Sequence, residues 1–468
     1  MKEKRKVFIP EKGLYQNFLI TGTIGTGKTS SAMYPFTKQL IKFNAYNFKQ
    51  KIGMLILDVK GNYYKEIKEI AKEYNLLQDL IIIEINGKIK YNPLHKPNLK
   101  ASVLADRLKT IINLFSNNTS ESYWIDKAEQ ILTESIKLCR LYNSNYVTFK
   151  EIHKIITNQQ YYLEKIEKVK RLFIEGKLNQ KQIYDFNTVL DFFEKEFNKL
   201  DLRTQSILKS EITRITNIFV SDYEVTKTFC PKIEELNFEG FSNLIKKGKI
   251  LVLNMNIAEY RNLSKIIAAY LKLDFQSEVM LNLSKNNVKR TAFICDEYAE
   301  YVTETDSEFF SLSREAKCIN IVSTQSYSSI KNTLKDETAT KVICQNLINK
   351  IWFRTDDIYT IEEIQKQLGK EEKIKVSENI SENARETKYS YFTKSLNSRN
   401  SSISQSYSTY NQNEYIYDTN YFTQKLEIFT CLAFLTDGSK IIKPQKLKML
   451  PYFENRDKER WSIEKRKK

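Results

Sequence analysis

The chain has 468 residues, enough for two or three domains, and 41% of them are hydrophobic, which predicts a folded protein. Lysine and arginine (74) outnumber aspartate and glutamate (57) by 17. This excess favours a polyanionic partner such as nucleic acid or an acidic membrane surface, although a lysine-rich proteome also explains it. Six widely spaced cysteines and two histidines argue against zinc sites, disulfide scaffolds and histidine catalysis.

The sequence offers no candidate for a membrane span or a secretion signal. The basic start, MKEKRK, is followed by apolar runs of only three or four residues, too short for a signal peptide. No later segment approaches the roughly 18 consecutive apolar residues of a spanning helix. We therefore expect a soluble protein of the reducing cytoplasm.

Short apolar runs rich in β-branched residues recur along the chain. They are FLITG (18–22), GMLILDV (53–59), LIIIEI (80–85), KILVLNM (249–255), TAFICDE (291–297), CINIVST (318–324), NKIWFRT (349–355) and IFTCLAFLT (428–436). These runs are apolar on both faces and alternate with helical patterns, which is typical of buried parallel strands. The sequence predicts an α/β fold with a mainly parallel central sheet.

The first run leads into LITGTIGTGKTSSA (19–32), which satisfies the phosphate-loop pattern G-x-x-x-x-G-K-[ST] without a mismatch. In this pattern glycines let backbone amides curl around phosphates, Lys28 reaches the β and γ phosphates, and Thr29 ligates magnesium. We predict that the chain binds ATP and Mg²⁺. The predicted binding residues are Gly22, Thr23, Ile24, Gly25, Thr26, Gly27, Lys28, Thr29 and Ser30.

The second run ends in LDVKG, which places Asp58, Lys60 and Gly61 just beyond a strand. Residues at such a strand exit line a nucleotide site or a subunit interface, but a plain turn explains them equally well.

The character of the chain then changes between about residues 100 and 235. Stretches such as KAEQILTESIKLCRLY (127–142) have helical spacing, so we predict an all-helical insertion.

A phosphate loop that hydrolyses its nucleotide needs one carboxylate for the metal and another to polarise water. The run TAFICDE supplies both, because Asp296 and Glu297 stand at the carboxyl end of a predicted strand. We predict that Asp296 binds Mg²⁺ and that Glu297 is the general base. The alternative is an acidic strand end that caps the next helix.

Two more polar residues flank the following strand. Gln325 is the fourth residue of VSTQS (322–326), with which the strand ends, and it either lies beside the γ phosphate or is an ordinary loop amide. Arg314 precedes the same strand on a predicted helix. It either projects into the phosphate site of a neighbouring subunit or is an ordinary surface arginine.

The carboxyl-terminal third contains two segments of unusual composition. Residues 386–415 are rich in Ser, Asn, Thr and Tyr without periodicity, which predicts a solvated, disordered loop. The strand signal at residue 428 indicates that the fold resumes afterwards. Residues 456–468 form a basic tail, a composition that more often serves solubility than binding.

In order and spacing, these segments resemble the coupling proteins of type IV secretion and conjugation, the TraG/TraD-like ATPases of the FtsK/HerA superfamily. The resemblance covers nearly the whole chain. The segments that carry it are GTIGTGKT, LDVKG, YNPL (91–94), YWIDKAEQIL (123–132), RTQSILKSEITRITNIF (203–219), ICDEY, SREAKCINIVSTQS, NKIWFRTDD and LKMLPYF (447–453).

The resemblance implies a RecA-like P-loop NTPase core formed by residues 1–100 and 236–455, with an all-α domain at 101–235. It also implies a homo-hexameric ring with ATP between subunits and single-stranded DNA, bound independently of sequence, in the channel. Arg314 would act in trans as a finger, and Gln325 would couple hydrolysis to DNA movement. Trp124 falls in the motif that opens the helical domain, where an aromatic core anchor explains it as well.

The implied function is ATP-driven DNA translocation, in which the protein recruits relaxase-bound DNA and feeds it to the secretion channel proteins. Two departures stand out: D-P-K-G reads D-V-K-G, and only 21 residues precede Gly22 where members have transmembrane helices. Unless an upstream start was missed, we expect attachment to the cytoplasmic face of the membrane only through a partner. The alternatives are a cytosolic FtsK/HerA-type DNA pump for repair, segregation or packaging, and an adaptor that binds nucleotide without hydrolysis.

Overall fold

A computed structural model gives the structure of the chain, and it describes residues 6–47, 49–115, 122–284, 288–382, 389–390, 395–396 and 403–453. The predicted basic tail at 456–468 lies outside these residues. The chain divides into two compact units. The first comprises Met1–Arg354 and Glu427–Lys468, and the second comprises Thr355–Leu426.

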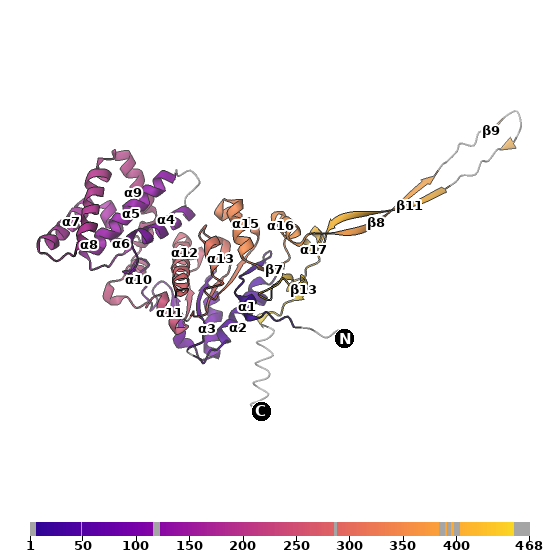
Figure 1. The fold of residues 1–468 in the computed structure, drawn as a ribbon, viewed down its shortest axis with the longest axis horizontal. Helices are drawn as coiled ribbons and strands as arrows, with labels where there is room; N and C mark the ends of the chain where they lie inside the picture. The colour runs from indigo at the N-terminus through magenta and orange to yellow at the C-terminus, as the bar shows by residue number, and fades with distance from the viewer. Residues whose placement is uncertain are drawn as a thin grey trace, which may run out of the picture. The chain divides into compact units, whose positions relative to one another are not determined.

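The first unit is built on a nine-stranded sheet with the order β13-β12-β7-β1-β6-β5-β2-β4-β3. Figure 1 shows the fold, with β7 and β13 of this sheet labelled. Its strands are β1 Phe18–Thr21, β2 Gly53–Leu57, β3 Leu80–Ile83, β4 Ile250–Leu253, β5 Thr291–Cys295, β6 Cys318–Thr324, β7 Asn349–Phe353, β12 Thr430–Phe434 and β13 Gln445–Lys448. The run from β7 to β3 is parallel throughout. The predicted α/β class with a mainly parallel sheet is therefore confirmed.

One edge of the sheet departs from the prediction. All eight predicted runs form strands, but β12 pairs antiparallel with β7, and β13, which was not predicted, pairs antiparallel with β12. A strand buried on both faces has the same apolar composition in either direction, so the pattern could not give the orientation of β12. The strand β13 (QKLK) is mostly exposed and polar, as is common for a sheet edge.

Helices cover both faces of the sheet. Side chains alternate between the faces along each strand, so the apolar residues of each strand pack against helices on both sides. On one face, Ile20, Ile56 and Ile294 join a core cluster that includes residues of α2 and α3. On the other face, Phe293 contacts Phe275 of α12. The helices of this part of the unit are α1 Glu11–Leu14, α2 Tyr34–Lys42, α3 Tyr63–Glu73, α11 Phe241–Lys247, α12 Ile257–Asn282, α13 Asp306–Leu312, α14 Tyr327–Leu334 and α15 Glu337–Asn346.

Between residues 101 and 235, every regular element in the described part of the chain is helical. The α-helices are α4 Ala101–Phe115, α5 Ser122–Tyr142, α6 Phe149–Thr157, α7 Gln159–Ile174, α8 Gln180–Leu190, α9 Leu202–Thr216 and α10 Tyr223–Phe229. Arg107 of this region and Lys96, just before it, lie 3.1 and 2.5 Å from the carboxylate of Asp274 on α12. A buried ionic contact therefore ties the helical region to the sheet-bearing part of the unit.

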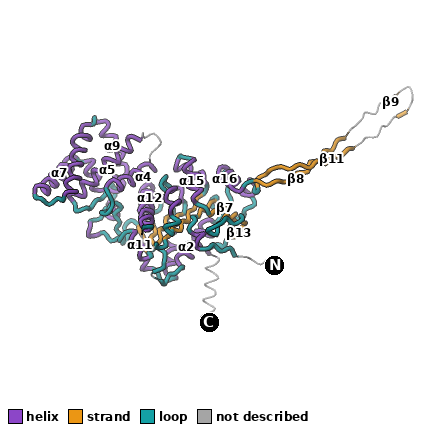
Figure 2. The backbone as a smooth tube through the Cα atoms, viewed as in Figure 1, coloured by secondary structure: helices purple, strands orange, loops and turns teal. Residues whose placement is uncertain are grey.

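The second unit contains α16 Ile358–Leu368, β8 Lys370–Glu382, β9 Tyr389–Ser390, β10 Ser395–Leu396, β11 Ile403–Tyr415 and α17 Thr419–Thr423. Strands β8 and β11 pair along their whole length as an antiparallel ribbon. Figure 2 shows them as two orange tubes side by side. The predicted disordered loop at 386–415 is therefore wrong for residues 403–415. The ribbon has no buried face that would impose apolar alternation, so no strand signal marks it in the sequence.

The second unit also corrects the predicted domain boundary. The sequence predicts one discontinuous RecA-like domain from residues 1–100 and 236–455, but sheet pairing stops at Phe353 of β7 and resumes at Thr430 of β12. The intervening residues, 355–426, form a unit of their own because they contribute no strand to the large sheet.

Candidate functional site

The segment between β1 and α2 forms a tight loop at the carboxyl edge of the sheet. It is followed by a π-helical turn, Thr29–Met33, that runs into α2. Gly25 and Gly27 have φ values of +80° and +98°, which favour glycine. At Gly27 a Cβ atom would lie 2.3 Å from the ring of Phe429, so the loop also packs too closely for a side chain there.

The loop is anchored at its base and open at its tip. The amide of Gly22 donates to the carbonyl of Gln325 over 3.2 Å, and that of Thr23 to the carbonyl of Arg354 over 2.9 Å. Ile24 and Gly25 at the tip are exposed. In the described part of the chain, the backbone amides from Ile24 to Lys28 donate to no acceptor. The loop therefore presents a row of unused donors, the chemistry that binds phosphate oxygens.

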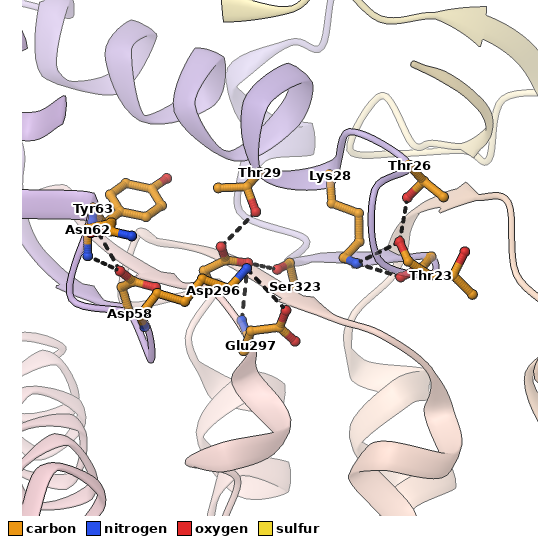
Figure 3. A network of polar contacts seen from close by, with 12 residues as sticks. Thr23, Thr26, Lys28, Thr29, Asp58, Asn62, Tyr63, Asp296, Glu297 and Ser323 are labelled. Carbon is orange, nitrogen blue, oxygen red and sulfur yellow. Dashed lines mark hydrogen bonds and ion pairs between the residues drawn. The ribbon is translucent and has the colours of Figure 1, made fainter. Parts of the chain in front are cut away.

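Lys28 points back into this loop (Figure 3). Its Nζ donates to the carbonyl oxygens of Gly22, at 2.5 Å, and Thr23, at 3.3 Å, and only 6% of the residue is exposed. Burial lowers the pKa of Lys28, and the nearby carboxylates of Glu297 and Asp296 oppose that shift. A buried cation held only by carbonyls suits a phosphate ligand, so the residues present fit a nucleotide.

Asp296, directly after β5, is the polar centre of the site. Its carboxylate accepts a hydrogen bond of 2.8 Å from Thr29 Oγ1 and another from Ser323 Oγ on β6. The residue is 1% exposed. These contacts, visible in Figure 3, join the phosphate loop, β5 and β6 at one point. A threonine hydroxyl and a carboxylate close together provide the oxygen ligands that Mg²⁺ prefers at such a loop.

Glu297 follows in the left-handed conformation, with φ 53° and ψ 48°. Burial raises the pKa of Glu297, and the Asp296 carboxylate raises it further. Lys28, Lys60 and a hydrogen bond from the Gln325 side chain act in the opposite direction. The Nζ of Lys60 is 4.0 Å from Oε1 of Glu297. A half-buried carboxylate with a raised pKa has the properties of a general base.

Asp58 and Lys60, which follow β2, have different contacts in the structure. Asp58 is 3% exposed and caps α3, because its carboxylate accepts from the amides of Lys60, Asn62 and Tyr63 at 3.1, 2.9 and 3.0 Å. It is therefore a turn and cap residue. Lys60, in contrast, reaches Glu297 and belongs to the site.

Of the other predicted residues, Gln325 joins the site and Arg314 does not. Arg314 was predicted on a helix but lies in the turn after α13, where it is exposed and its Nη2 is 3.5 Å from the carbonyl of Gly438. The turn precedes β6, whose seven residues span roughly 20 Å at about 3.3 Å per residue. Arg314 is therefore at the opposite edge of the sheet from Asp296 of the same chain.

Ser323 and Phe429 are contacts that the sequence interpretation missed. The signal for Ser323 was a polar residue inside an apolar strand. No local pattern marks Phe429, which lies about 400 residues after the loop in the chain but donates its amide to the carbonyl of Thr26 over 3.1 Å. Trp124, predicted either as a motif residue or as a core anchor, is partly buried on α5 with its ring centroid 5.2 Å from that of Tyr123.

The described residues contain neither a cluster of metal-binding side chains nor a helix that could span a membrane. No group of three or more His, Cys, Asp or Glu side chains there could hold a metal ion on its own. Among the helices of the described residues, none combines the length and the hydrophobicity needed to cross a membrane. All six cysteines are free thiols.

This fold and this loop define a RecA-like P-loop nucleotide-binding protein. Residues 290–415 match the family model described as the TraM recognition site of TraD and TraG. No match was found among curated proteins. The resemblance to TraG/TraD-like coupling proteins that the sequence predicted is thus confirmed over these residues.

Solved structures of a conjugative coupling protein have the same fold. The unbound bacterial conjugative coupling protein TrwBdeltaN70 is 12% identical, with a TM-score of 0.60, over 96% of this chain and 89% of that one. TrwB bound to the GTP analogue GDPNP has a TM-score of 0.61 at 12% identity, over 96% and 90% of the two chains. TrwB with ADP and Mg²⁺ has a TM-score of 0.58 at 12% identity and the same coverage.

Proposed function

We propose that this chain is an ATP-driven DNA translocase that acts as a coupling protein in conjugation or type IV secretion, recruiting relaxase-bound DNA and feeding it to the secretion channel. One observation carries the proposal. The phosphate loop and two adjacent carboxylates meet at the carboxyl edge of a RecA-like sheet, in a chain whose fold follows a conjugative coupling protein over 96% of its length.

The residues of the site have separable roles in this proposal. The free amides of the loop and Lys28, once released from the carbonyls of Gly22 and Thr23, bind the β and γ phosphates of ATP. Thr29 and Asp296 hold Mg²⁺, which neutralises phosphate charge when bound. Glu297 takes a proton from the water whose oxygen bonds to the γ phosphorus. The bond from that phosphorus to the bridging oxygen breaks, and ADP leaves with this oxygen on its β phosphate. The raised pKa makes Glu297 a stronger base than an exposed carboxylate.

Arg314 and Gln325 connect the site to its neighbours. Because Arg314 lies at the other edge of the sheet, it cannot reach the phosphates of its own chain, and we assign it to the site of an adjacent subunit in a homo-hexamer. The carbonyl of Gln325 holds the base of the loop, and its side chain acts to lower the pKa of Glu297. It is placed to relay the nucleotide state to β6 and the segments that follow.

The partners in this proposal are single-stranded DNA, a relaxase and channel proteins, with membrane attachment only through a partner. The excess of 17 positive charges favours a DNA backbone bound without sequence preference. The match of residues 290–415 to a model named for TraM recognition supports contact with the proteins that assemble on transferred DNA. The TrwB structure with ADP and Mg²⁺ supports ATP and Mg²⁺ as ligands.

The test is the ATPase rate of the purified chain with and without single-stranded DNA. We expect DNA to stimulate turnover, and we expect Lys28→Ala to abolish it. Lys42→Ala, an exposed lysine on α2, is the matched control and should leave the rate unchanged. Equal turnover in the Lys28→Ala variant and the unaltered chain would refute the proposal. Stimulation that requires a relaxase–DNA complex would separate coupling from a general DNA pump.

A further inference from the structure

The helical region contains a cavity of about 450 Å³ that the nucleotide site does not use. It lies between the segment that leads into α4, the carboxyl-terminal half of α5 and the first turns of α8. Its charged lining consists of four cationic side chains and one carboxylate, namely Lys100, Lys137, Lys181, Arg140 and Asp185. Asn98, Ser102, Thr133, Asn145 and Gln182 add hydrogen-bonding groups. The cavity is therefore cationic and rich in donors.

Arg140 is one of the partly buried cations of this cavity. Its guanidinium donates to the carbonyls of Leu99, at 2.7 Å, and Lys96, at 2.8 Å, while its Nε is buried without a partner among the described residues. No described carboxylate contacts it, and burial lowers the pKa of Arg140, an effect that Asp185 opposes from a distance. The neutral carbonyls orient the guanidinium but do not balance its charge.

The lysines divide into one that is paired and two that are not. Lys137 is 2.8 Å from Glu134, so its charge is largely matched. Lys100 and Lys181 are exposed, and neither forms an ion pair within the described ranges. The net charge of the cavity therefore comes mainly from Arg140 inside and these two lysines.

The lining also restricts the chemistry of the ligand. It includes no aromatic side chain, so a nucleobase would find nothing to stack on. A volume of about 450 Å³ exceeds that of a water molecule, roughly 30 Å³, by more than tenfold, enough for a phosphate and the adjoining sugar. Several donors around an unbalanced guanidinium match the oxygens of a phosphate group.

We propose that this cavity binds a phosphate group of a single-stranded DNA backbone, without reading the base. The inference rests on the proposed function, because the net charge of the chain and the proposed cargo identify DNA as the source of the phosphate. A free phosphate would use the same chemistry. The cavity would then give the helical region a contact with the strand that is separate from the ATP site.

The experiment measures binding of fluorescein-labelled oligo(dT) to the full chain by fluorescence anisotropy over a series of salt concentrations. We expect the double variant Lys100→Glu/Lys181→Glu to raise Kd at least about tenfold and to reduce the slope of log K against log salt, by about 0.7 for each phosphate that the variant no longer neutralises. The matched control is Lys199→Glu/Arg203→Glu, which makes the same charge change at exposed residues outside the cavity. It should change Kd less than about threefold. Equal weakening in both doubles, or none in either, would overturn the proposal.

A calorimetric titration with inorganic phosphate separates failure of the site from failure of the proposed function. It uses Lys28→Ala as the background, so that the nucleotide loop does not contribute. Phosphate binding that disappears when Lys100→Glu/Lys181→Glu is added supports the site, even if the unaltered chain fails to bind DNA and the proposed cargo is wrong. DNA binding that the double variant leaves intact, together with no phosphate binding, refutes the site and leaves the proposed function standing.

Discussion

Thr29 Oγ1 donates a hydrogen bond of 2.8 Å to Asp296 Oδ2, across a separation of 267 residues in the sequence. The bond is possible because β1 and β5 both pair with β6, so their carboxyl ends lie at the same edge of the sheet. Neither strand alone contains the site. The contact makes the position of the phosphate loop depend on the position of the acidic pair.

The first prediction concerns this hydroxyl. Thr29→Val keeps the shape of the side chain but removes the oxygen donor, so the Mg²⁺ concentration for half-maximal ATPase turnover should rise at least about tenfold. Titration of turnover with Mg²⁺ measures the shift. Thr29→Ser retains the hydroxyl and should behave like the unaltered chain. An unchanged Mg²⁺ dependence in Thr29→Val would exclude Thr29 from the metal site.

The second prediction follows from the raised pKa of Glu297. A carboxyl with a raised pKa holds its proton more tightly in the folded state, so its ionisation lowers stability as pH rises above the pKa of an exposed glutamate. This cost is complete above the folded-state pKa. Glu297→Gln should therefore raise the Tm at neutral pH, and the difference should shrink in acid.

The same substitution should reduce ATPase turnover by about 10²–10⁴-fold while ATP binding persists, because it removes the proposed general base. Thermal unfolding across pH and single-turnover hydrolysis test both effects. Glu300→Gln, on the same segment but exposed beside Lys265, is the control and should alter neither quantity. A lower Tm for Glu297→Gln at neutral pH would contradict the sign of the shift.

The third prediction compares two glycines of the loop. Gly27→Ala combines backbone strain at φ +98° with a contact of 2.3 Å to Phe429, whereas Gly25→Ala has φ +80° and open space. We expect Gly25→Ala to cost about 1–2 kcal/mol from strain alone. Gly27→Ala should cost a further 1–3 kcal/mol or so from overpacking. Urea unfolding measures both, and Phe429→Ala in the Gly27→Ala background should recover only the second part.

The fourth prediction concerns a buried ionic network behind the acidic pair. Lys272 Nζ is 2.6 Å from Asp306 Oδ2, and both side chains are 0% exposed. Tyr298, the residue after Glu297, donates to the same oxygen over 2.6 Å. Lys272→Met would leave the carboxylate buried without its cation and should cost about 3–5 kcal/mol in urea unfolding.

The exposed pair Lys170–Glu167 provides the control for that measurement, and Lys170→Met should be indistinguishable from the unaltered chain. Similar midpoints for Lys272→Met and Lys170→Met would show that the buried pair adds nothing. Tyr298→Phe should have an intermediate effect, because it removes one neutral donor and leaves the ion pair.

The sequence predicted the sheet well because buried parallel strands are continuous apolar runs, and each of the eight runs, from FLITG to IFTCLAFLT, is a strand. It could not predict the ribbon of β8 and β11, where Ile374 is 73% exposed and Tyr407 64%, because an exposed ribbon carries no burial pattern. The orientation of β12 depends on how the chain returns after the second unit, which no local pattern encodes.

The candidate site likewise contains residues that a local sequence pattern predicts and residues that it does not. Gly22, Lys28 and Thr29 belong to one contiguous motif, and the acidic pair ends an apolar strand, so local patterns were sufficient to find them. Ser323 is marked locally only as a polar residue inside an apolar strand, and Phe429 is not marked at all, because both reach the site through strand order and the return of the chain. The turn at Arg314 was mistaken for helix because its composition suits either.

The position of Arg314 just before β6 has a geometric consequence. Ser323, near the end of the strand, lies beside the acidic pair at one edge of the sheet. The strand begins near Arg314 at the other edge, so the nucleotide site and Arg314 of one subunit lie at opposite edges. Under the proposed role of Arg314, a contact between unlike edges would leave a dimer with one site that receives an arginine and one that does not. A closed ring would supply an arginine to every site, so the proposal predicts that turnover per chain increases with assembly size until the ring closes.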